Sequence, residues 1–342
     1  MLGRTVPNPF SGFLSRHFDE INAYLASFFS DKTDNADIER YLYAPLSTFS
    51  ANAGKRHRPL ICMLACAAVG GDFSCAKSAA AAIEHFQSAA LIHDDIADNG
   101  QLRRGKPCMY LTEGVGIATN CGDLALSLVT GSVLEDDDID DAMKIRLLRE
   151  LVAMTTRTIE GQALDLGWVR DGRFDLTVED YLRMATLKTA YYSGATPLAC
   201  GSIMGGGTDE QTEALRAFGL RCGLAFQIQD DLLNLVGEKD ARNKDFRTDI
   251  TEGKRTLVAV HALQDPEHHD ELVRILSSAP TDEETLERAV RIFSDSGSID
   301  YARSYSFELT AEAKRILDTV QIDPHAKQLF MGMADFFVER LN

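Results

Sequence analysis

The sequence predicts an all-α protein, a single domain in which many helices pack into one bundle. Apolar residues recur three or four positions apart in segment after segment, which is the period of a helix buried along one face. Strand signals are nearly absent, because alternating β-branched runs do not recur and the one Asn-Gly pair, Asn99-Gly100, follows a helical stretch. The breaks between segments are short Gly or Pro clusters rather than linkers, so we expect one domain over residues 1–342.

The predicted helices follow one another along the chain. The helix over residues 18–29 falls within residues 1–30, a part that we expect at the periphery of the domain. The other predicted helices cover residues 58–69, 75–96, 120–134, 143–161 and 210–235. The acidic run EDDDIDD at residues 135–141 lies between two of them. We interpret it as a solvated turn whose carboxylates favour the start of the next helix.

The composition argues against several classes of protein. The chain has 35 Lys and Arg against 52 Asp and Glu, a formal charge of −17, which disfavours a nucleic-acid binder. A content of 45% apolar and 25% charged residues is typical of a globular protein. The most apolar stretch that we single out, residues 61–69, is far shorter than a membrane helix of about 20 residues, so we expect no stable membrane anchor. Residues 1–18 lack the apolar core of a secretion signal, and we expect a cytoplasmic protein.

The seven cysteines are scattered through apolar surroundings without a C-x-x-C pair, so we expect them to be reduced and buried. Cys62 and Cys66 share a face of one predicted helix. No second Cys or His pair at metal-site spacing accompanies them, which disfavours a cysteine metal site.

Three carboxylates end the strongly apolar helix predicted over residues 75–96. Asp94 and Asp98 project from one helix face one turn apart, and Asp95 stands beside them. Such a cluster is costly unless a cation neutralises it, and ligands with oxygen alone suit a hard ion such as Mg²⁺. Arg103 and Arg104 follow shortly afterwards.

The helix predicted over residues 210–235 carries a second cluster of oxygen ligands, with Asp230, Asp231 and Asn234 at the same spacing. The basic and acidic residues Lys244, Asp249 and Lys254 follow it. Because Mg²⁺ usually binds through one or two carboxylates plus substrate phosphates, two such clusters flanked by cations suggest metal ions that hold a diphosphate. The run Gly54-Lys55-Arg56-His57-Arg58-Pro59 is a third basic element, and we interpret it as a second anion site.

Together these elements resemble the trans-isoprenyl diphosphate synthases of the polyprenyl synthetase family. The run from Asp94 to Gly105 matches the first aspartate-rich motif of that family, and Gln227 to Asp231 matches the second. The other matches are GKRHRP to the isopentenyl diphosphate loop, Lys188-Thr189 to the Lys-Thr pair, and Gly161-Gln162-x-x-Asp165 to the GQxxD helix. The resemblance covers residues 54–256 by motif, and it implies an isoprenoid-synthase bundle of helices around a central cavity.

The resemblance also implies a role for each matching residue. Asp94, Asp98 and Asp230 would be the main Mg²⁺ ligands, supported by Asp95, Asp231 and Asn234, with three Mg²⁺ in each active site. Arg103, Lys188, Lys244 and Lys254 would contact the allylic diphosphate. Lys55, Arg58, Gln87 and Arg104 would hold isopentenyl diphosphate, while Thr189 and Gln227 would lie along the reacting carbons. The resemblance further implies a homodimer.

Two positions depart from the pattern of the family. Asn234 stands where many members have Asp, and Arg247 stands where many have Gly. The first change removes a formal charge, so the outer metal site would bind its ion more weakly. The fragments DDLLNL and NKDFRTDITEGK nevertheless resemble the geranylgeranyl diphosphate synthases of the fungal and animal type.

The implied reaction is a magnesium-dependent condensation of isopentenyl diphosphate with dimethylallyl, geranyl or farnesyl diphosphate. Product length is predicted from the residues before Asp94. Ala89 and Ala90 are small, whereas Phe86 lies one turn deeper than Ala90, about 5.4 Å along the helix axis. If Phe86 forms the floor of the cavity, where it stops the growing prenyl chain, the product is geranylgeranyl diphosphate. Farnesyl diphosphate and products of 25 carbons and more are the alternatives. Phe86 could instead merely pack against a neighbouring helix, in which case the floor lies elsewhere, as on the helix over residues 120–134.

Three other functions compete with this interpretation. A metal-dependent phosphohydrolase built on His93-Asp94 would need further His ligands, and the sequence lacks a second dyad in a comparable helix. A class I terpene cyclase also binds its substrate through metal ions at acidic motifs. It binds no second diphosphate, however, and so has no need of the GKRHRP loop. A non-catalytic partner subunit of a synthase is favoured by Asn234 and disfavoured by the other Asp, Lys and Arg residues of the motifs.

Overall fold

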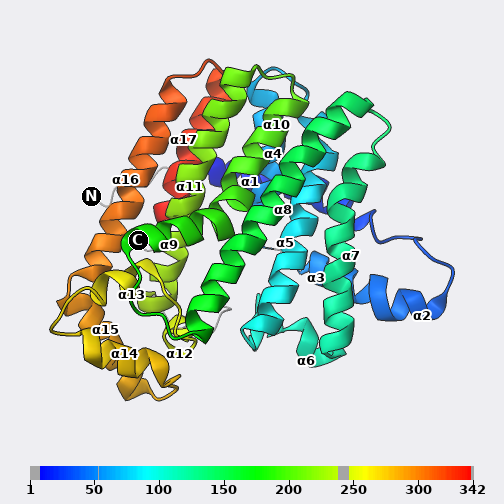
Figure 1. Ribbon diagram of the computed structural model, residues 1–342. Coiled ribbons are helices and arrows are strands. Elements are labelled where there is room, and N and C mark those ends of the chain that lie inside the picture. The colour runs from blue at the N-terminus through cyan, green and yellow to red at the C-terminus, as the bar shows by residue number, and fades with distance from the viewer. Residues whose placement is uncertain (1–7, 53, 238–245, 340–342) are drawn as a thin grey trace, which may run out of the picture.

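The computed structural model describes residues 8–52, 54–237 and 246–339, and it confirms the all-α prediction (Figure 1). The α-helices are α1 (Pro9–Ala26), α2 (Ala36–Ile38), α3 (Ala44–Ala51), α4 (His57–Ala68), α5 (Lys77–Ala97), α6 (Met109–Glu113), α7 (Val115–Leu134), α8 (Asp141–Arg170), α9 (Val178–Ala185), α10 (Thr196–Met204), α11 (Asp209–Val236), α12 (Thr248–Thr251), α13 (Leu257–Ala262), α14 (His269–Ser277), α15 (Glu283–Asp295), α16 (Ser298–Asp318) and α17 (Pro324–Val338). Two π-helical segments, η1 (Glu39–Tyr43) and η3 (Thr186–Ala195), and the 3₁₀ turn η2 (Phe73–Ala76) complete the helical elements.

The strands of the described residues form one small hairpin. β1 (Leu102–Arg103) and β2 (Lys106–Pro107) pair in antiparallel fashion, with Leu102 opposite Pro107. This hairpin follows α5 directly, and it turns the chain back toward the end of that helix.

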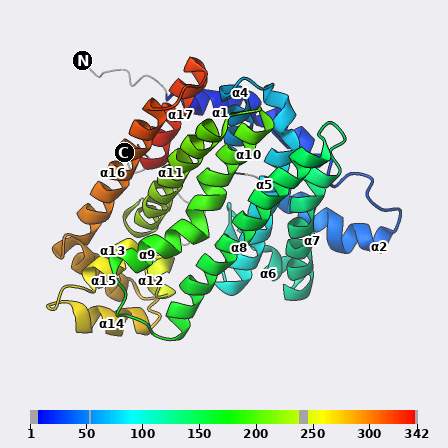
Figure 2. The same ribbon diagram turned by 45° about the horizontal axis from the view of Figure 1, so that its top comes forward.

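The long helices lie side by side, as both views show (Figures 1 and 2). α5 packs between α4 and α7, α8 packs against η3, and α11 packs against η3 and α16. The main apolar core joins α1, α4, α5, α10, α17 and the first half of α11. A second core packs the end of α11 against α9 and the helices from α13 to α16.

The first helix is part of the main core. Asn8 caps it by accepting a hydrogen bond from the Phe10 amide, and a proline occupies its first position. Phe10, Ile21 and Leu25 are buried in the main core, where α3, α4, α5 and α17 cover them. Residues 9–26 of the segment 1–30, which we expected at the periphery, therefore contribute apolar side chains to the core.

The acidic run before α8 forms a turn, as predicted. The side chain of Asp140 caps α8 by accepting a hydrogen bond from the Met143 amide, and Asp141 lies in the first turn of the helix. α8 continues to Arg170, nine residues beyond the predicted end at 161.

α7 is long and apolar enough to cross a membrane, judged by length and composition alone. Within the described residues, this helix is a longer apolar segment than residues 61–69, the stretch that our sequence argument took as the most apolar. In the structure α7 is a helix of the bundle, and its residues Ala118, Cys121 and Ala125 are buried together with residues of α3 and α5.

The cysteines are unpaired, and six of the seven are buried as expected. Cys75 is the exception, because it is exposed in η2.

Candidate active site

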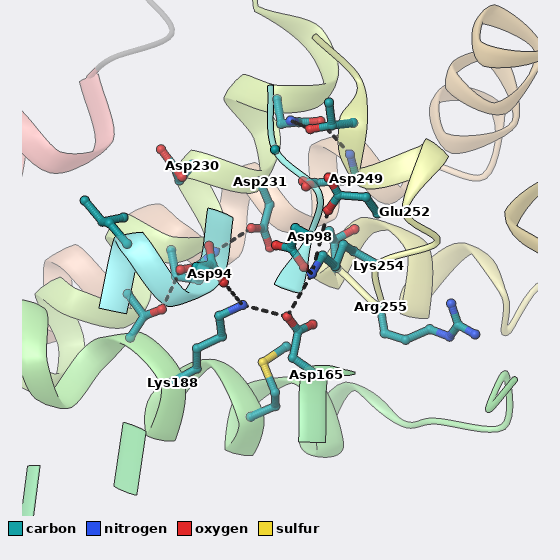
Figure 3. A pocket seen from close by; sticks show the side chains of 18 of the residues that line it. Asp94, Asp98, Asp165, Lys188, Asp230, Asp231, Asp249, Glu252, Lys254 and Arg255 are labelled. Carbon is teal, nitrogen blue, oxygen red and sulfur yellow. Dashed lines mark hydrogen bonds and ion pairs between the residues drawn. The ribbon is translucent and has the colours of Figure 1, made fainter. Parts of the chain in front are cut away.

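A cavity opens where α5, α8, η3, α11 and the turn before α13 meet (Figure 3). Most residues of the two acidic motifs line it, together with two of the three lysines that the resemblance assigns to the allylic diphosphate. The predicted residues in its wall are Asp94, Asp95, Asp98, Arg103, Lys188, Thr189, Gln227, Asp230, Asp231, Asn234 and Lys254. Lys244 lies outside the described residues.

Asp94 and Asp98 enter the cavity one turn apart, as predicted. Burial raises the pKa of Asp98, and repulsion from Asp94 raises it further. Burial also opposes the charge of Asp94, but Lys188, Lys254 and Arg103 outweigh it and lower the pKa of that carboxyl. The Asp94 carboxylate also accepts a hydrogen bond of 3.0 Å from the Gln162 side chain of α8.

Asp95 does not present an open carboxylate to the cavity. Its side chain is 2% exposed, and Arg103 Nε donates to it at 2.8 Å. The hairpin after α5 carries Arg103 back to this position. In this structure Asp95 therefore holds Arg103 in place, in contrast to the supporting metal ligand implied by the resemblance. Arg103 itself also lies 3.9 Å from an Asp94 oxygen.

Asp165 of α8 accepts hydrogen bonds from both Lys188 and Lys254. Lys188 Nζ lies 2.6 Å and Lys254 Nζ 3.3 Å from the same Asp165 oxygen, and Lys254 also donates to Asp98 at 2.8 Å (Figure 3). Burial works against the charge of both lysines, but the surrounding carboxylates outweigh it, so the pKa of each is raised. Both lysines are therefore charged, and an incoming diphosphate would compete with carboxylates for them.

A glycine sets the place of Lys188. A Cβ atom on Gly161 would lie 2.2 Å from the Lys188 backbone nitrogen, so only glycine allows η3 to approach α8 this closely. This contact gives a physical reason for the first residue of the GQxxD motif.

On the α11 side, two hydrogen bonds hold Asp231, and Asp230 lines the same cavity. Gln227 Nε2 donates to Asp231 at 2.6 Å, and the Tyr181 hydroxyl donates to its other oxygen at 2.7 Å. Thr189 donates to Gln227 at 2.6 Å, so these two residues, which the resemblance places along the reacting carbons, are neighbours. Burial and repulsion from Asp249 raise the pKa of Asp231 well above its usual range.

Asn234 connects α11 to the segment that starts α12. Its side-chain nitrogen donates to the Thr248 hydroxyl at 3.0 Å, and its side-chain oxygen accepts from the Asp249 amide at 3.3 Å. Its carbonyl accepts from the Arg247 amide at 3.1 Å. Arg247 has a φ of 61°, a left-handed conformation that explains why many family members have glycine there.

The sequence argument missed several residues in the cavity wall. Glu252 is one, and its pKa is raised to about 8 by burial and then by repulsion from Asp98. Tyr181 and Arg255 are others, and Asp249, which the sequence argument named without giving it a role, also lines the wall. Glu252 stands two residues before Lys254, and an acid this close to a lysine with an expected role is the signal that could have found it.

The basic loop lies beside this cavity, along α5. Arg58 is buried, and its guanidinium donates to Gln87 at 3.0 Å, to Ser193 at 2.8 Å and to the Tyr192 hydroxyl at 3.3 Å. Arg58 and Gln87, which the resemblance assigns to isopentenyl diphosphate, are therefore in contact, and in this structure the Arg58 guanidinium is bonded to protein groups. The Lys55 ammonium lies 4.7 Å above the Phe336 ring of α17, at a second hollow lined by α1.

The residues predicted to set product length occupy different surroundings. Ala89 packs toward α3 and α7, whereas Ala90 packs against the main core. Phe86 is buried, and its ring lies 5.6 Å from the ring of Tyr192. Tyr192, and not Phe86, lines the cavity. Tyr192 therefore lies between the cavity and Phe86. This arrangement differs from the prediction that Phe86 alone forms the floor of the cavity.

His93 is directed toward α7 and is absent from the lining of the cavity that holds Asp94 and Asp98. Its Nε2 atom lies 3.4 Å from the Thr119 carbonyl and 3.4 Å from an Asp123 oxygen, both on α7. The side chain fits over Gly122, where a Cβ atom would lie 2.3 Å from it. His93 and Asp94 therefore do not act as a metal-binding dyad, which removes the structural basis of the phosphohydrolase alternative.

An all-α bundle with two acidic motifs and paired lysines around one cavity is the arrangement of the isoprenoid-synthase class of enzymes. The sequence pattern of the polyprenyl synthetase family matches residues 39–293. A short chain isoprenyl diphosphate synthase of Methanothermobacter thermautotrophicus is 37% identical over 289 residues, covering 84% of this chain and 86% of its own. A geranylfarnesyl diphosphate synthase of Natronomonas pharaonis is 38% identical over 304 residues, with the same shares of 84% and 86%.

The fold agrees with these relatives. The structure of a geranylgeranyl pyrophosphate synthase from Corynebacterium glutamicum, in complex with isoprenyl diphosphate and magnesium, superposes with a TM-score of 0.85 at 27% identity. The match covers 98% of this chain and 100% of that one. The chain belongs to the polyprenyl synthetase family, and it is a trans-prenyltransferase.

Proposed function

We propose that the enzyme condenses isopentenyl diphosphate with dimethylallyl, geranyl or farnesyl diphosphate and releases geranylgeranyl diphosphate as its main product. The main support for this proposal is the composition of the cavity wall. Three carboxylates and two lysines line this one cavity: Asp94, Asp98, Asp230, Lys188 and Lys254. Carboxylates and cations in one cavity suit a substrate that carries both a diphosphate and metal ions.

The donor set fits magnesium bound together with a diphosphate. The raised pKa values of Asp98 and Asp231 show carboxylates that are buried close to like charges, which is the situation a cation relieves. No three His, Cys, Asp or Glu side chains within the described ranges form a ready-made metal site. Ligands from the substrate would therefore complete the coordination, as is usual for Mg²⁺. We propose three ions, held by Asp94 and Asp98 on one side and by Asp230 on the other.

The residues of the chain have distinct tasks in this reaction. Magnesium, when bound, supplies positive charge to the departing diphosphate. Lys188 and Lys254 add charge on the same side and hold that group as the bond from carbon to oxygen breaks. Thr189 and Gln227 lie along the allylic cation, which the double bond of isopentenyl diphosphate attacks. The proton that the new product loses passes to the released diphosphate.

Product length would be set where Tyr192 meets the cavity. The Tyr192 ring covers Phe86, and its hydroxyl is fixed by Arg58, so the ring has a defined place. The small residues Ala89 and Ala90 leave no aromatic group on α5 nearer to Asp94 than Phe86. This pattern supports a product of 20 carbons, and a relative that is a geranylfarnesyl synthase supports longer products as the alternative.

The test is an assay of the purified protein with radiolabelled isopentenyl diphosphate and each of the three allylic primers, with and without magnesium. We expect magnesium-dependent incorporation and one main product at the length of geranylgeranyl diphosphate on chromatography. Absence of incorporation with every primer would contradict the proposal and favour the non-catalytic subunit.

We also propose that the enzyme is a homodimer that pairs through α8. The side chains of Ile145, Val152, Ile159 and Leu166 follow at seven-residue intervals and are 52%, 55%, 59% and 36% exposed. An interval of seven residues drifts only about 20° around a helix, so the four form one apolar stripe. Exposed stripes of this kind mark protein interfaces, and a second copy of the same stripe is a matching partner.

Light scattering coupled to size-exclusion chromatography tests the dimer. We expect twice the chain mass for the wild type and a shift toward the monomer for Val152→Glu with Ile159→Glu. A monomeric wild type would contradict this proposal. The cytoplasmic location stays a prediction.

A further inference from the structure

Arg56 in the basic loop has no role in the proposed function. It lies between Lys55 and Arg58, directly before α4, and its φ of 52° is left-handed. A residue other than glycine is strained in this conformation, so its surroundings must hold it there. The residue is 4% exposed, which turns its guanidinium into the protein and away from a substrate.

Three helices hold the Arg56 guanidinium, each through a different nitrogen. Nε donates to the Asn22 side chain of α1 at 2.8 Å, and Nη2 donates to the Ser50 carbonyl of α3. Nη1 forms an ion pair with Glu84 of α5. Both charged side chains of that pair are almost fully buried, at 2% and 4% exposure. Because a buried charge without its partner is costly, the pair fixes the two side chains to each other.

Glu84 belongs to the face of α5 that serves the active site. Glu84, Gln87, Leu91, Asp94 and Asp98 follow at intervals of three and four, and so they share one face. At one end of this face Glu84 binds Arg56 and Gln87 binds Arg58. At the other end, about 15 Å further along the axis, Asp94 enters the cavity. One helix face therefore joins the anchor of the basic loop to the carboxylates of the metal site.

A second contact holds the loop from the opposite side. Arg104, in the hairpin after α5, donates to the Asn52 carbonyl at 2.8 Å. A Cβ atom on Gly54 would lie 3.6 Å from the Arg104 guanidinium, so the two segments are in close contact. Asn52 and Gly54 thus contact Arg104, while the Arg56 side chain fixes the residues just before α4.

We propose that Arg56 is a positioning residue that, through Glu84, sets the place of the Lys55–Arg58 loop relative to Asp94 and Asp98. It thereby fixes where the diphosphate of isopentenyl diphosphate lies against the allylic substrate. This inference rests on the proposed function, because it takes the basic loop as the site of isopentenyl diphosphate.

Steady-state kinetics of Arg56→Lys and Glu84→Gln test the inference, with KM measured separately for the two substrates. Lysine keeps the charge but loses the three-way hydrogen bonding, and glutamine keeps the size but loses the ion pair. We expect each variant to raise the KM for isopentenyl diphosphate about tenfold, the loss typical of one charged hydrogen bond. The KM for the allylic substrate should stay unchanged, because its diphosphate is held by other residues.

Arg216→Lys is the matched control. Arg216 of α11 forms a forked pair with Glu150 at 2.6 and 2.9 Å, and it lies about three helical turns before Gln227. This variant loses the same kind of interaction away from the site, so neither KM should change.

Circular dichroism first establishes that the variants are folded. If Arg56→Lys does not fold, the kinetics of Glu84→Gln alone test the inference. An unchanged KM for isopentenyl diphosphate in a folded variant, or an equal rise in both KM values, overturns the inference. If the wild type is active in the same experiment, the proposed function still holds. An inactive wild type overturns both.

Discussion

Asp94 and Asp98 carry the strongest prediction for single residues. We expect Asp94→Ala and Asp98→Ala each to lower the initial rate by about a hundredfold or more, because a charged group aimed at the reacting centre typically contributes that much. The rate is measured with both substrates and magnesium at saturation. Asp300→Ala, which removes a highly exposed carboxylate on α16, is the control. A rate within a few-fold of the wild type would rule out the metal assignment.

The same two variants should differ in stability when magnesium and substrates are absent. The pKa of Asp98 is raised by burial and by Asp94, so removing its charge should hold or raise the Tm. The pKa of Asp94 is lowered because its cationic neighbours outweigh burial, so removing that charge should lower the Tm. Thermal melts in a chelating buffer measure both, and equal shifts in one direction would contradict this reasoning.

Asn234→Asp should lower the magnesium concentration that gives half of the maximal rate. The substitution adds a negative charge in the cavity wall beside the second acidic motif. A carboxylate oxygen can still accept from the Asp249 amide, while the Thr248 hydroxyl, which accepts from the Asn234 side chain, would donate to the carboxylate instead. A magnesium titration of the initial rate measures the effect, and product length should not change. An unchanged half-saturation concentration would mean that Asn234 acts only as the link to α12.

At the scale of elements, the contact between α8 and η3 depends on one glycine. Gly161→Ala would place a Cβ atom 2.2 Å from the Lys188 backbone, so we expect a loss of about 1–3 kcal/mol in stability and a displaced Lys188 with low activity. Gly167→Ala on the same helix is the control, because no atom lies within 4 Å of its Cβ position. There alanine should stabilise the helix by up to about 1 kcal/mol. Denaturant unfolding compares the two, and equal effects would refute the packing argument.

The packing of η3 against α5 should control product length. We expect Tyr192→Ala to lengthen the product by one or more isoprene units, since the ring that lines the cavity is removed. Phe86→Ala should lengthen it less, because Tyr192 still stands before it. Ala90→Phe should shorten the product. Chromatography of the products decides, and no shift in any of the three would place the floor elsewhere, as on α7.

At the scale of the whole molecule, a buried histidine should make the protein sensitive to acid. Burial, and then the charge of Arg56, lowers the pKa of His85 to about 3. An unfolded chain takes up this proton near pH 6.5, so stability is complete above that pH and falls as the pH decreases toward 3. The slope contributed by this one group is about 1.4 kcal/mol for each pH unit.

The variant His85→Phe should flatten this dependence. The ring of His85 already lies against the rings of Phe28 and Phe29, at 4.7 and 5.7 Å, so phenylalanine suits the site. Denaturant unfolding of the two proteins between pH 4 and 7 compares the slopes. An equally steep fall in the variant would assign the acid sensitivity to other groups.

Some features of this protein follow from local sequence alone. The helices were predictable because the apolar period of 3.6 residues is a local property of the backbone. The same geometry put Asp94 and Asp98 on one face, and it made the acidic run before α8 a capped turn. The family motifs identified the reaction, since their residue types and spacing are themselves the chemical signal.

Only the tertiary structure decided which side chains meet. The sequence placed Asp95 among the metal ligands and Arg103 on the substrate, whereas the hairpin turns Arg103 onto Asp95. It gave no sign that Asp165 gathers Lys188 and Lys254, or that Tyr192 stands before Phe86. These pairings join helices far apart in the chain, and they depend on how the bundle packs and on close approaches such as that at Gly161. Helical periodicity fixes the face of a side chain, but its partner is set by packing energy, which is not local in the sequence.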